Sequence, residues 1–351
     1  MIERRTTRVI NAGGVPIGGG NPVVIQSMTN TKTHDIEATL AQIERLEAAG
    51  CSIARLAVLD MEAVSAFKEI KKSAKIPLVA DIHFDYRLAI ASIEAGADKI
   101  RINPGNIGAK ERVKAVIDAA RGNKIPIRIG VNSGSLEKHL IDKYGSPCAE
   151  ALAESALSWI DYFQSEKFGD IVVSIKASEV LTTIKACRKL AERTDVPQHI
   201  GITESGTVRS GSIRSAVGIG TLLAEGIGDT IRVSLAGDPV HEIYAAKEIL
   251  KSLELMEGPV VIACPTCGRT EIDVESLAQK VEALVSNIKT PLKIAVMGCV
   301  VNGPGEAREA DFGIAGGKGE GLIFVKGKPL KKVPEDKLLE ELETQIKNYI
   351  Q

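Results

Sequence analysis

Aromatic residues are scarce in this chain of 351 residues, at 3% of the sequence. They are too few to form the stacking platforms by which proteins hold single-stranded nucleic acid. Positive charge is not in excess either, because 44 lysines and arginines stand against 45 aspartates and glutamates and leave a net charge of −1. A protein that coats nucleic acid through general basicity is therefore not expected, although a local basic pocket is compatible with this balance.

Long apolar runs are also missing. No stretch approaches the roughly 18 apolar residues that a membrane span requires. The charged first residues, with Arg4, Arg5 and Arg8, are not followed by the apolar segment of a secretory signal. The six cysteines are too sparse for a disulfide scaffold. We therefore expect a cytoplasmic protein that acts at no membrane.

Short β-branched runs alternate with longer amphipathic runs from residue 22 to about residue 250. In the first amphipathic run, Ile36, Leu40, Ile43 and Leu46 form one apolar helix face. Eight β-α units in about 230 residues predict a (β/α)8 barrel of the TIM type. A doubly wound sheet is the alternative, because periodicity does not show closure. The predicted strands are 22–28, 52–58, 76–82, 99–103, 126–132, 170–176, 198–204 and 230–235.

Two further segments lie outside this rhythm. Residues 7–17 predict a β-hairpin that closes the floor of the barrel. After residue 257 the pattern predicts a small α+β domain, so we expect domains of residues 1–257 and 258–351. Its predicted helices carry the stripes that begin at Val274 and Leu338. Its predicted strands are 259–263, 292–297, 311–315 and 322–325.

Polar residues recur on one face of the predicted barrel strands. Side chains alternate between the two faces of a strand, and in a barrel the polar face meets the lumen. The polar residues lie towards the carboxyl ends of the strands, where barrel active sites are built. This alternation assigns to the mouth of the lumen Arg55, Arg101, Arg128, Lys176 and Arg232 with the carboxylates Asp81 and Glu204, and beside them His83, Asn132 and Ser234.

The residues assigned to the mouth of the lumen form a predicted ring that holds five cations and two carboxylates. A single buried arginine is usually an ion-pair partner, but five cations cannot all pair with two carboxylates. Uncompensated buried charge is costly. Arginine binds phosphate and diphosphate through paired hydrogen bonds. The ring therefore predicts an anionic ligand that carries at least two negative charges.

Three cysteines cluster late in the chain. Cys264 and Cys267 form a C-x2-C pair, and Cys299 precedes a glycine-rich segment at 302–305. Structural zinc requires four ligands, and because every histidine precedes residue 257, a fourth would have to come from the barrel, for example Cys148. A redox dithiol would leave Cys299 without a role. An iron–sulfur cluster with three cysteine ligands and a different fourth ligand fits best.

Together the two sites suggest reductive removal of a hydroxyl or a similar oxygen from a diphosphate substrate. The alternative is a non-redox barrel enzyme that acts on a phosphorylated substrate and carries a zinc domain as scaffold. A metal-dependent binding protein gains no support from so many polar residues in the lumen.

Five long motifs are similar to those of one enzyme family. They are residues 79–86 (VADIHFDY), 101–106 (RINPGN), 226–235 (GIGDTIRVSL), 263–270 (ACPTCGRT) and 296–307 (VMGCVVNGPGEA). In these motifs the chain resembles the 4-hydroxy-3-methylbut-2-en-1-yl diphosphate synthases, in their bacterial two-domain form. The resemblance implies reductive ring opening and dehydration of 2-C-methyl-D-erythritol 2,4-cyclodiphosphate with two electrons from a flavodoxin or ferredoxin.

The resemblance also implies residue roles. A [4Fe-4S] cluster would be bound by Cys264, Cys267, Cys299 and Glu306. The five cations, with Asn132 and Ser234, would hold the cyclic diphosphate. Glu204 would handle protons, and Asp81 and His83 are further candidates for proton transfer or orientation. The family forms homodimers, so a homodimer is expected.

Overall fold

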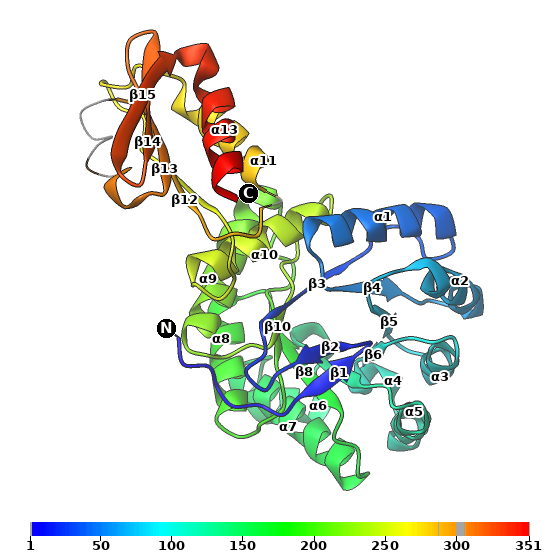
Figure 1. Ribbon diagram of the computed structural model, residues 1–351. Helices are drawn as coiled ribbons and strands as arrows, with labels where there is room; N and C mark the ends of the chain where they lie inside the picture. The colour runs from blue at the N-terminus through cyan, green and yellow to red at the C-terminus, as the bar shows by residue number, and fades with distance from the viewer. Residues whose placement is uncertain (1, 287, 300–304, 306, 351) are drawn as a thin grey trace. The chain divides into compact units, whose positions relative to one another are not determined.

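The computed structural model of the protein describes residues 2–286, 288–299, 305 and 307–350. The chain divides into two compact units, Met1–Met256 and Glu257–Gln351 (Figure 1). None of the helices in the described ranges has both the length and the apolar character needed to cross a membrane.

The first unit alternates parallel strands with helices. Its strands are β3 (Val24–Met28), β4 (Ile53–Ala57), β5 (Leu78–Ile82), β6 (Lys99–Ile102), β7 (Ile127–Asn132), β8 (Ile171–Lys176), β9 (His199–Ile200) and β10 (Thr230–Ile231). Its helices are α1 (Ile36–Ala49), α2 (Met61–Ser73), α3 (Tyr86–Glu94), α4 (Pro104–Ile107), α5 (Lys110–Asn123), α6 (Lys138–Tyr144), α7 (Ala149–Ser165), α8 (Val180–Ala191), α9 (Val208–Ala224) and α10 (Val240–Ser252).

These strands form a barrel. The hydrogen-bonded order is β8-β7-β6-β5-β4-β3-β10-β9, and every neighbouring pair is parallel. A parallel bridge between Val173 and Gln198 joins β8 to the segment that enters β9 and nearly closes the ring. The predicted (β/α)8 barrel is therefore confirmed, and the doubly wound alternative is wrong.

The last two strands are much shorter than the sequence predicts. β9 ends at Ile200 and β10 at Ile231, whereas the predicted runs continue to residues 204 and 235. The backbone passes very close to itself here: a Cβ at Gly201 would lie 2.4 Å from the carbonyl oxygen of Arg232. This approach replaces a regular ladder beyond Ile200, so Glu204 lies in a turn and not at the end of a strand.

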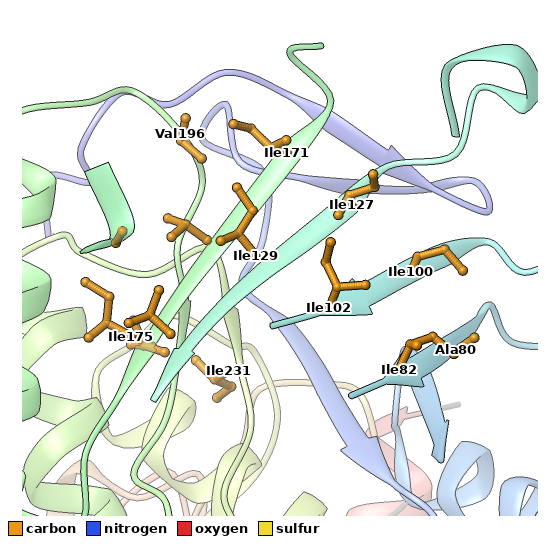
Figure 2. Packing of buried hydrophobic residues seen from close by; sticks show 14 of the residues in the cluster. Ala80, Ile82, Ile100, Ile102, Ile127, Ile129, Ile171, Ile175, Val196 and Ile231 are labelled. Carbon is orange, nitrogen blue, oxygen red and sulfur yellow. The ribbon is translucent and has the colours of Figure 1, made fainter. Parts of the chain in front are cut away.

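An apolar layer separates the strands from the surrounding helices. Figure 2 shows part of it, with Ala80 and Ile82 of β5, Ile100 and Ile102 of β6, and Ile127 of β7. The residues between them along the same strands are charged and also buried, as with Lys99 and Arg101. Because successive side chains point to opposite faces, these charged side chains face the lumen.

Short polar signals fix where the helices begin and end. The side chain of Asp35 accepts a hydrogen bond from Ala38 N at 3.0 Å and caps the start of α1, and Gly50, with φ of 104°, caps its end. Asp60 caps α2 in the same way through Ala63 N at 2.8 Å. Such caps satisfy the first backbone N–H groups of each helix and hold the loops at the carboxyl ends of the strands.

A hairpin of β1 (Ile10–Ala12) and β2 (Val15–Ile17) precedes the barrel. Ile10 and Ile17 are buried in a separate apolar cluster with side chains near the amino ends of the strands: Val24, Ile53, Val79 and Val172. The predicted floor of the barrel is thus present, and it is apolar.

The second unit contains one mixed sheet. Its order is β11-β12-β13-β14-β15, in which the first three strands are parallel and the last two pairings are antiparallel. The elements are β11 (Val260–Ala263), α11 (Val274–Val285), β12 (Lys293–Met297), β13 (Phe312–Gly316), β14 (Glu320–Val325), β15 (Lys328–Pro334) and α13 (Leu338–Ile350). Helices α11 and α13 contribute Val281, Leu342 and Ile346 to the core against the sheet.

Strand β15 is absent from the sequence-based prediction. Its residues, KPLKKVP, are mostly exposed and lack an apolar face. Within the described part of the unit it is an edge strand that pairs with β14 alone, so lysines and prolines are tolerated where a central strand would need buried side chains.

The floor hairpin should stabilise the barrel by burial alone. Ile17→Ala removes a fully buried side chain and is expected to lower the free energy of unfolding of the barrel by about 2–4 kcal/mol. Trp159, the single tryptophan, lies in the barrel, so its fluorescence during urea denaturation reports this unit. Val9→Ala at a 56% exposed position is the control and should change little. An equal effect of the two variants would contradict the packing role.

Candidate active site

The five predicted cations share the barrel lumen: Arg128 is the second residue of β7, and the other four lie farther towards the carboxyl ends of their strands. Arg55 of β4, Arg101 of β6, Arg128 of β7 and Lys176 of β8 are each at most 7% exposed. Arg232 directly follows β10, and its side chain is 18% exposed. Their charges act on one another: each of the other four lowers the pKa of Lys176, after burial, which is the largest cause. The lumen therefore holds a compact cationic cluster.

Asp81 lies inside this cluster on β5. Its Oδ1 accepts a hydrogen bond from Arg101 Nη1 at 3.0 Å, and its Oδ2 lies 3.8 Å from Arg55 Nε. Burial alone would raise the pKa of Asp81, but the charge of Arg55, the hydrogen bond to His83 and the charge of Arg101 outweigh it. They hold the pKa far below its ordinary value. Asp81 is thus a permanent carboxylate at neutral pH.

His83 follows Asp81 at the rim of the lumen. Its Nε2 lies 2.9 Å from Arg101 Nη1 and 3.4 Å from Asp81 Oδ2, and the side chain is 40% exposed. It therefore touches both the buried charges and the solvent.

A second buried carboxylate reaches Arg232 from a helix and is missed by the strand pattern. Glu242 of α10 is 2% exposed and binds Arg232 through two contacts, at 2.9 and 3.1 Å. Ser27 Oγ also donates to it at 2.7 Å. Strand alternation cannot find a helical residue, and only its position in the first turn of α10, ten residues after Arg232, hints at the pair.

Glu204 does not join this cluster, which corrects the prediction that it lies with Asp81 in the lumen. It is exposed, it has a backbone φ of +52°, and its Oε2 accepts a hydrogen bond from Ser178 Oγ at 2.7 Å. Positive φ is uncommon outside glycine and marks a constrained position. Since Ser178 and Glu204 follow β8 and β9, both lie in loops at the mouth of the barrel.

The remaining predicted residues lie at the same end of the barrel. The amide of Asn132, in the orientation that satisfies its hydrogen bonds, accepts from Arg101 Nη2 at 3.2 Å. Ser234 is half-buried two residues after Arg232. Gly130 leaves room for the guanidinium, because a Cβ there would lie 2.8 Å from Arg101 Nε.

Positive charge in the lumen exceeds the available protein counter-charge. Among the described residues, Arg128 Nε and Nη1 have no hydrogen-bond partner, although the side chain is 1% exposed. Burial, and then Arg55 and Arg101, hold the pKa of Arg128 well below its ordinary value. The buried donors require an acceptor that the surrounding side chains do not supply. An anion with several oxygens meets that requirement.

In the second unit the three late cysteines line one cavity of about 150 Å³. Cys264 directly follows β11, and Cys299 lies two residues after β12, at the carboxyl ends of adjacent parallel strands. Thr270 Oγ1 accepts a hydrogen bond from Cys267 N at 3.0 Å and shapes the connecting turn. The other lining residues are Pro265, Arg269, Met297 and Gly298.

This cavity suits an iron–sulfur cluster. Its described lining offers sulfur donors and neither histidine nor carboxylate. Gly298 N donates to Cys264 Sγ at 3.1 Å, a type of contact that stabilises a ligating thiolate and tunes a cluster. Elsewhere in the described ranges, as here, no three His, Cys, Asp or Glu side chains are gathered closely enough for one metal ion. A cluster does not require this, because its thiolates bind different iron atoms. The predicted fourth ligand, Glu306, lies outside the described residues.

The barrel cysteines differ from these three. Burial raises the pKa of Cys51 to about 11 and that of Cys187 to about 12, so both thiols are inert at neutral pH. Cys148 is half-buried at the start of α7.

A parallel barrel with a cationic mouth, followed by a separate unit with a three-cysteine cavity, defines a two-domain barrel enzyme. The chain belongs to the GcpE family: the GcpE TIM-barrel domain matches residues 7–247 and the GcpE protein C-terminal domain matches residues 260–348.

Similar curated proteins cover nearly the whole chain. A protein of Caldanaerobacter subterraneus subsp. tengcongensis is 60% identical over 100% of this chain and 99% of its own length. One of Geobacillus thermodenitrificans is 57% identical over 99% of this chain and 93% of its own length. Both are named 4-hydroxy-3-methylbut-2-en-1-yl diphosphate synthase (flavodoxin).

Solved structures share the barrel fold. Dihydropteroate synthase from Stenotrophomonas maltophilia aligns with a TM-score of 0.52 at 15% identity, over 71% of this chain and 97% of that chain. Truncated 3-deoxy-D-arabino-heptulosonate 7-phosphate synthase from Thermotoga maritima gives a TM-score of 0.50 at 14% identity, over 71% of this chain and 91% of that one. At these identities the likeness concerns the fold alone.

The buried ion pair between Glu242 and Arg232 should stabilise the barrel. Glu242→Gln leaves the arginine without its counter-charge and is expected to lower the free energy of unfolding of the barrel by about 3 kcal/mol. Urea denaturation followed by Trp159 fluorescence measures it. Glu248→Gln, on the same helix at a carboxylate that is 66% exposed, is the matched control and should cost less than about 0.5 kcal/mol. Equal stability of the two variants would show that the buried pair is not stabilising.

Proposed function

We propose that this chain catalyses the reductive ring opening and dehydration of 2-C-methyl-D-erythritol 2,4-cyclodiphosphate to 4-hydroxy-3-methylbut-2-enyl diphosphate. Relatives that are 55–60% identical over nearly the whole chain carry the name of this synthase. The observation that carries the proposal is the excess of buried positive charge in the barrel mouth, in a chain that also presents a three-cysteine cavity.

The cyclic diphosphate is bound by the lumen cations. Arg128 and Lys176 supply charge that Asp81 and Glu242 do not neutralise. Asp81 and Glu242 orient Arg101 and Arg232 so that their remaining N–H groups point at the ligand. Asn132 and Ser234 add neutral hydrogen bonds. Because these groups are held before binding, little ordering is required when the substrate enters.

The proposed cluster of the second unit is [4Fe-4S], held by Cys264, Cys267 and Cys299 with Glu306 as the fourth ligand. When bound, it supplies the two electrons of the reaction in single steps, together with a Lewis-acidic iron. The Gly298 N–H stabilises the thiolate form of Cys264.

Proton transfer is assigned to the rim of the barrel mouth. Because Asp81 stays ionised, its role is to orient Arg101 and His83 and not to donate a proton. Glu204, held by Ser178, is the proposed donor to the hydroxyl that leaves as water. His83 is the second candidate, since it reaches both the solvent and the buried charges.

The same proposal assigns partners and domains. The names of the relatives specify flavodoxin, so a flavodoxin is the proposed electron donor of this chain. Residues 1–257 are proposed to bind the substrate, and residues 258–351 are proposed to hold the cluster. A homodimer is the proposed assembly.

Anaerobic reconstitution with iron and sulfide tests the function and the ligand set together. The wild type should bind about four iron and four sulfide atoms per chain and turn over the cyclic diphosphate with a chemical reductant. Cys299→Ser should lose most of the sulfide and at least about 100-fold in turnover, because a hydroxyl is a poor cluster ligand.

Cys148→Ser is the matched control, since it removes a half-buried thiol of the barrel. It should keep normal iron, sulfide and turnover. Bound zinc without sulfide, lost in Cys148→Ser, would instead favour the scaffold alternative. Normal sulfide content in Cys299→Ser would remove Cys299 from the ligand set.

Glu204→Gln tests the proton donor. The variant keeps the size of the side chain and a hydrogen bond to Ser178, so binding of the cyclic diphosphate should change less than about 3-fold. Turnover should fall by about 100-fold or more, because the amide cannot donate the required proton. Binding is measured by calorimetry and turnover by product formation with the reconstituted protein. Undiminished turnover would reduce Glu204 to a structural residue of the loop.

A further inference from the structure

A layer of buried polar side chains lies beneath the cationic mouth. It consists of Gln26, Lys99, Arg128 and His199, called here the lower layer. Each is at most 1% exposed, and each has at least one side-chain nitrogen without a hydrogen-bond partner among the described residues. Gln26 follows Val24 by two residues on β3, so the lower layer lies directly above the apolar floor.

Lys99 is the unusual member of the lower layer. It lies on β6 two residues before Arg101, on the same inward face, and is 0% exposed. Its Nζ has no hydrogen-bond partner within the described chain. Buried lysines are ordinarily paired with a carboxylate, because an unpaired ammonium in the interior is costly.

The groups that face Lys99 are cationic or neutral. They are Arg128 from β7, Arg55 from β4 and His199 from β9, and the register neighbour on β5 is the apolar Val79. The two buried carboxylates nearest the cations are engaged elsewhere, Asp81 with Arg101 and Arg55, and Glu242 with Arg232. Burial, and then the charges of Arg128 and Arg55, lower the pKa of Lys99 to about 7. Burial also holds the pKa of His199 well below its ordinary value, so this ring stays neutral.

An incoming diphosphate changes this balance. Each phosphorus of the cyclic diphosphate carries one strongly acidic oxygen, so the ligand brings two negative charges and does not itself titrate near neutral pH. Placed on Arg55 and Arg128, these charges offset the two groups that disfavour a charged Lys99. A proton from solvent then binds the amine, and the ammonium adds to the attraction for the ligand.

We propose that Lys99 is a positioning residue of the substrate site that takes up a proton when the cyclic diphosphate binds. The lower layer is then less charged while the site is empty and more cationic when it is filled. This inference rests on the proposed function, because the ligand is the proposed substrate.

Proton uptake can be measured directly. The full-length protein with reconstituted cluster is titrated with the cyclic diphosphate at pH 8, without reductant, in two buffers with different heats of ionisation. At this pH a lysine with a pKa of about 7 is mostly neutral in the empty site, so the wild type should take up about one proton or more per site. Affinity should fall as the pH rises above about 7, because binding is coupled to proton uptake and the proton concentration is then lower.

Lys99→Gln should reduce the uptake by about one proton and flatten the pH dependence of binding, with a weaker effect on affinity near pH 9 than near pH 7. Lys99→Met is the second variant in case the amide is not tolerated. Gln26→Leu is the matched control: it removes an equally buried, unpartnered polar group of the lower layer that cannot titrate. It should keep the proton uptake of the wild type.

The outcomes separate this inference from the function on which it rests. Saturable binding and turnover with less than half a proton taken up by the wild type overturn the role of Lys99 and leave the function intact. Unchanged uptake in Lys99→Gln or Lys99→Met does the same. Absence of both binding and turnover in the wild type overturns the proposed function, and this inference with it. Proton uptake by the wild type can contradict the proposal without any variant, so the proposal stays testable if neither Lys99 variant folds.

Discussion

Positive charge without sufficient protein counter-charge, held inside the barrel, is the constraint on which the barrel unit depends. Arg128 keeps two side-chain nitrogens without an acceptor among the described residues, at 1% exposure. Such a group is expensive, and the surrounding apolar layer must offset it. The two layers come from the same strands: the pleat that sends Ile100 and Ile102 towards the helices sends Lys99 and Arg101 into the lumen. The same strands therefore supply the apolar side chains that stabilise the barrel and the charged side chains that can bind a ligand.

The side chains that line the lumen change in character along the barrel axis. Ile10 and Ile17 of the hairpin pack as apolar side chains against the amino ends of the strands. Above them the polar side chains fall into a lower layer and a mouth, and among the described residues the lower layer contains no carboxylate. The mouth and the lower layer therefore differ in how they respond to a ligand. The mouth is oriented by Asp81 and Glu242 before any ligand arrives, whereas the lower layer is left to respond to the charge of the ligand.

Much of this arrangement could be predicted from the sequence, and each exception has a physical reason. The inward position of Arg55, Arg101, Arg128 and Lys176 follows from strand alternation, which is local. Glu242 could not be found this way, because it lies on a helix and meets Arg232 only through the fold. Alternation misplaces Glu204 because β9 ends at Ile200, where Gly201 lies close to Arg232, about 30 residues away in the chain. Strand β15 cannot be predicted from an apolar pattern, because an edge strand needs no apolar face.

The sequence by itself determined the periodicities: which residues form strands and helices, which face of each strand is polar, and which cysteines occur at ligand spacing. These properties depend on neighbours within a few residues, where backbone geometry leaves few choices. The tertiary structure alone decided which cations have a partner, that Asp81 stays ionised, and that Lys99 is buried without a carboxylate. It also decided that Cys264, Cys267 and Cys299 line one cavity. Charge balance and burial depend on atoms that are distant in the chain, so they exist only once the strands have closed into a barrel and the sheet has formed.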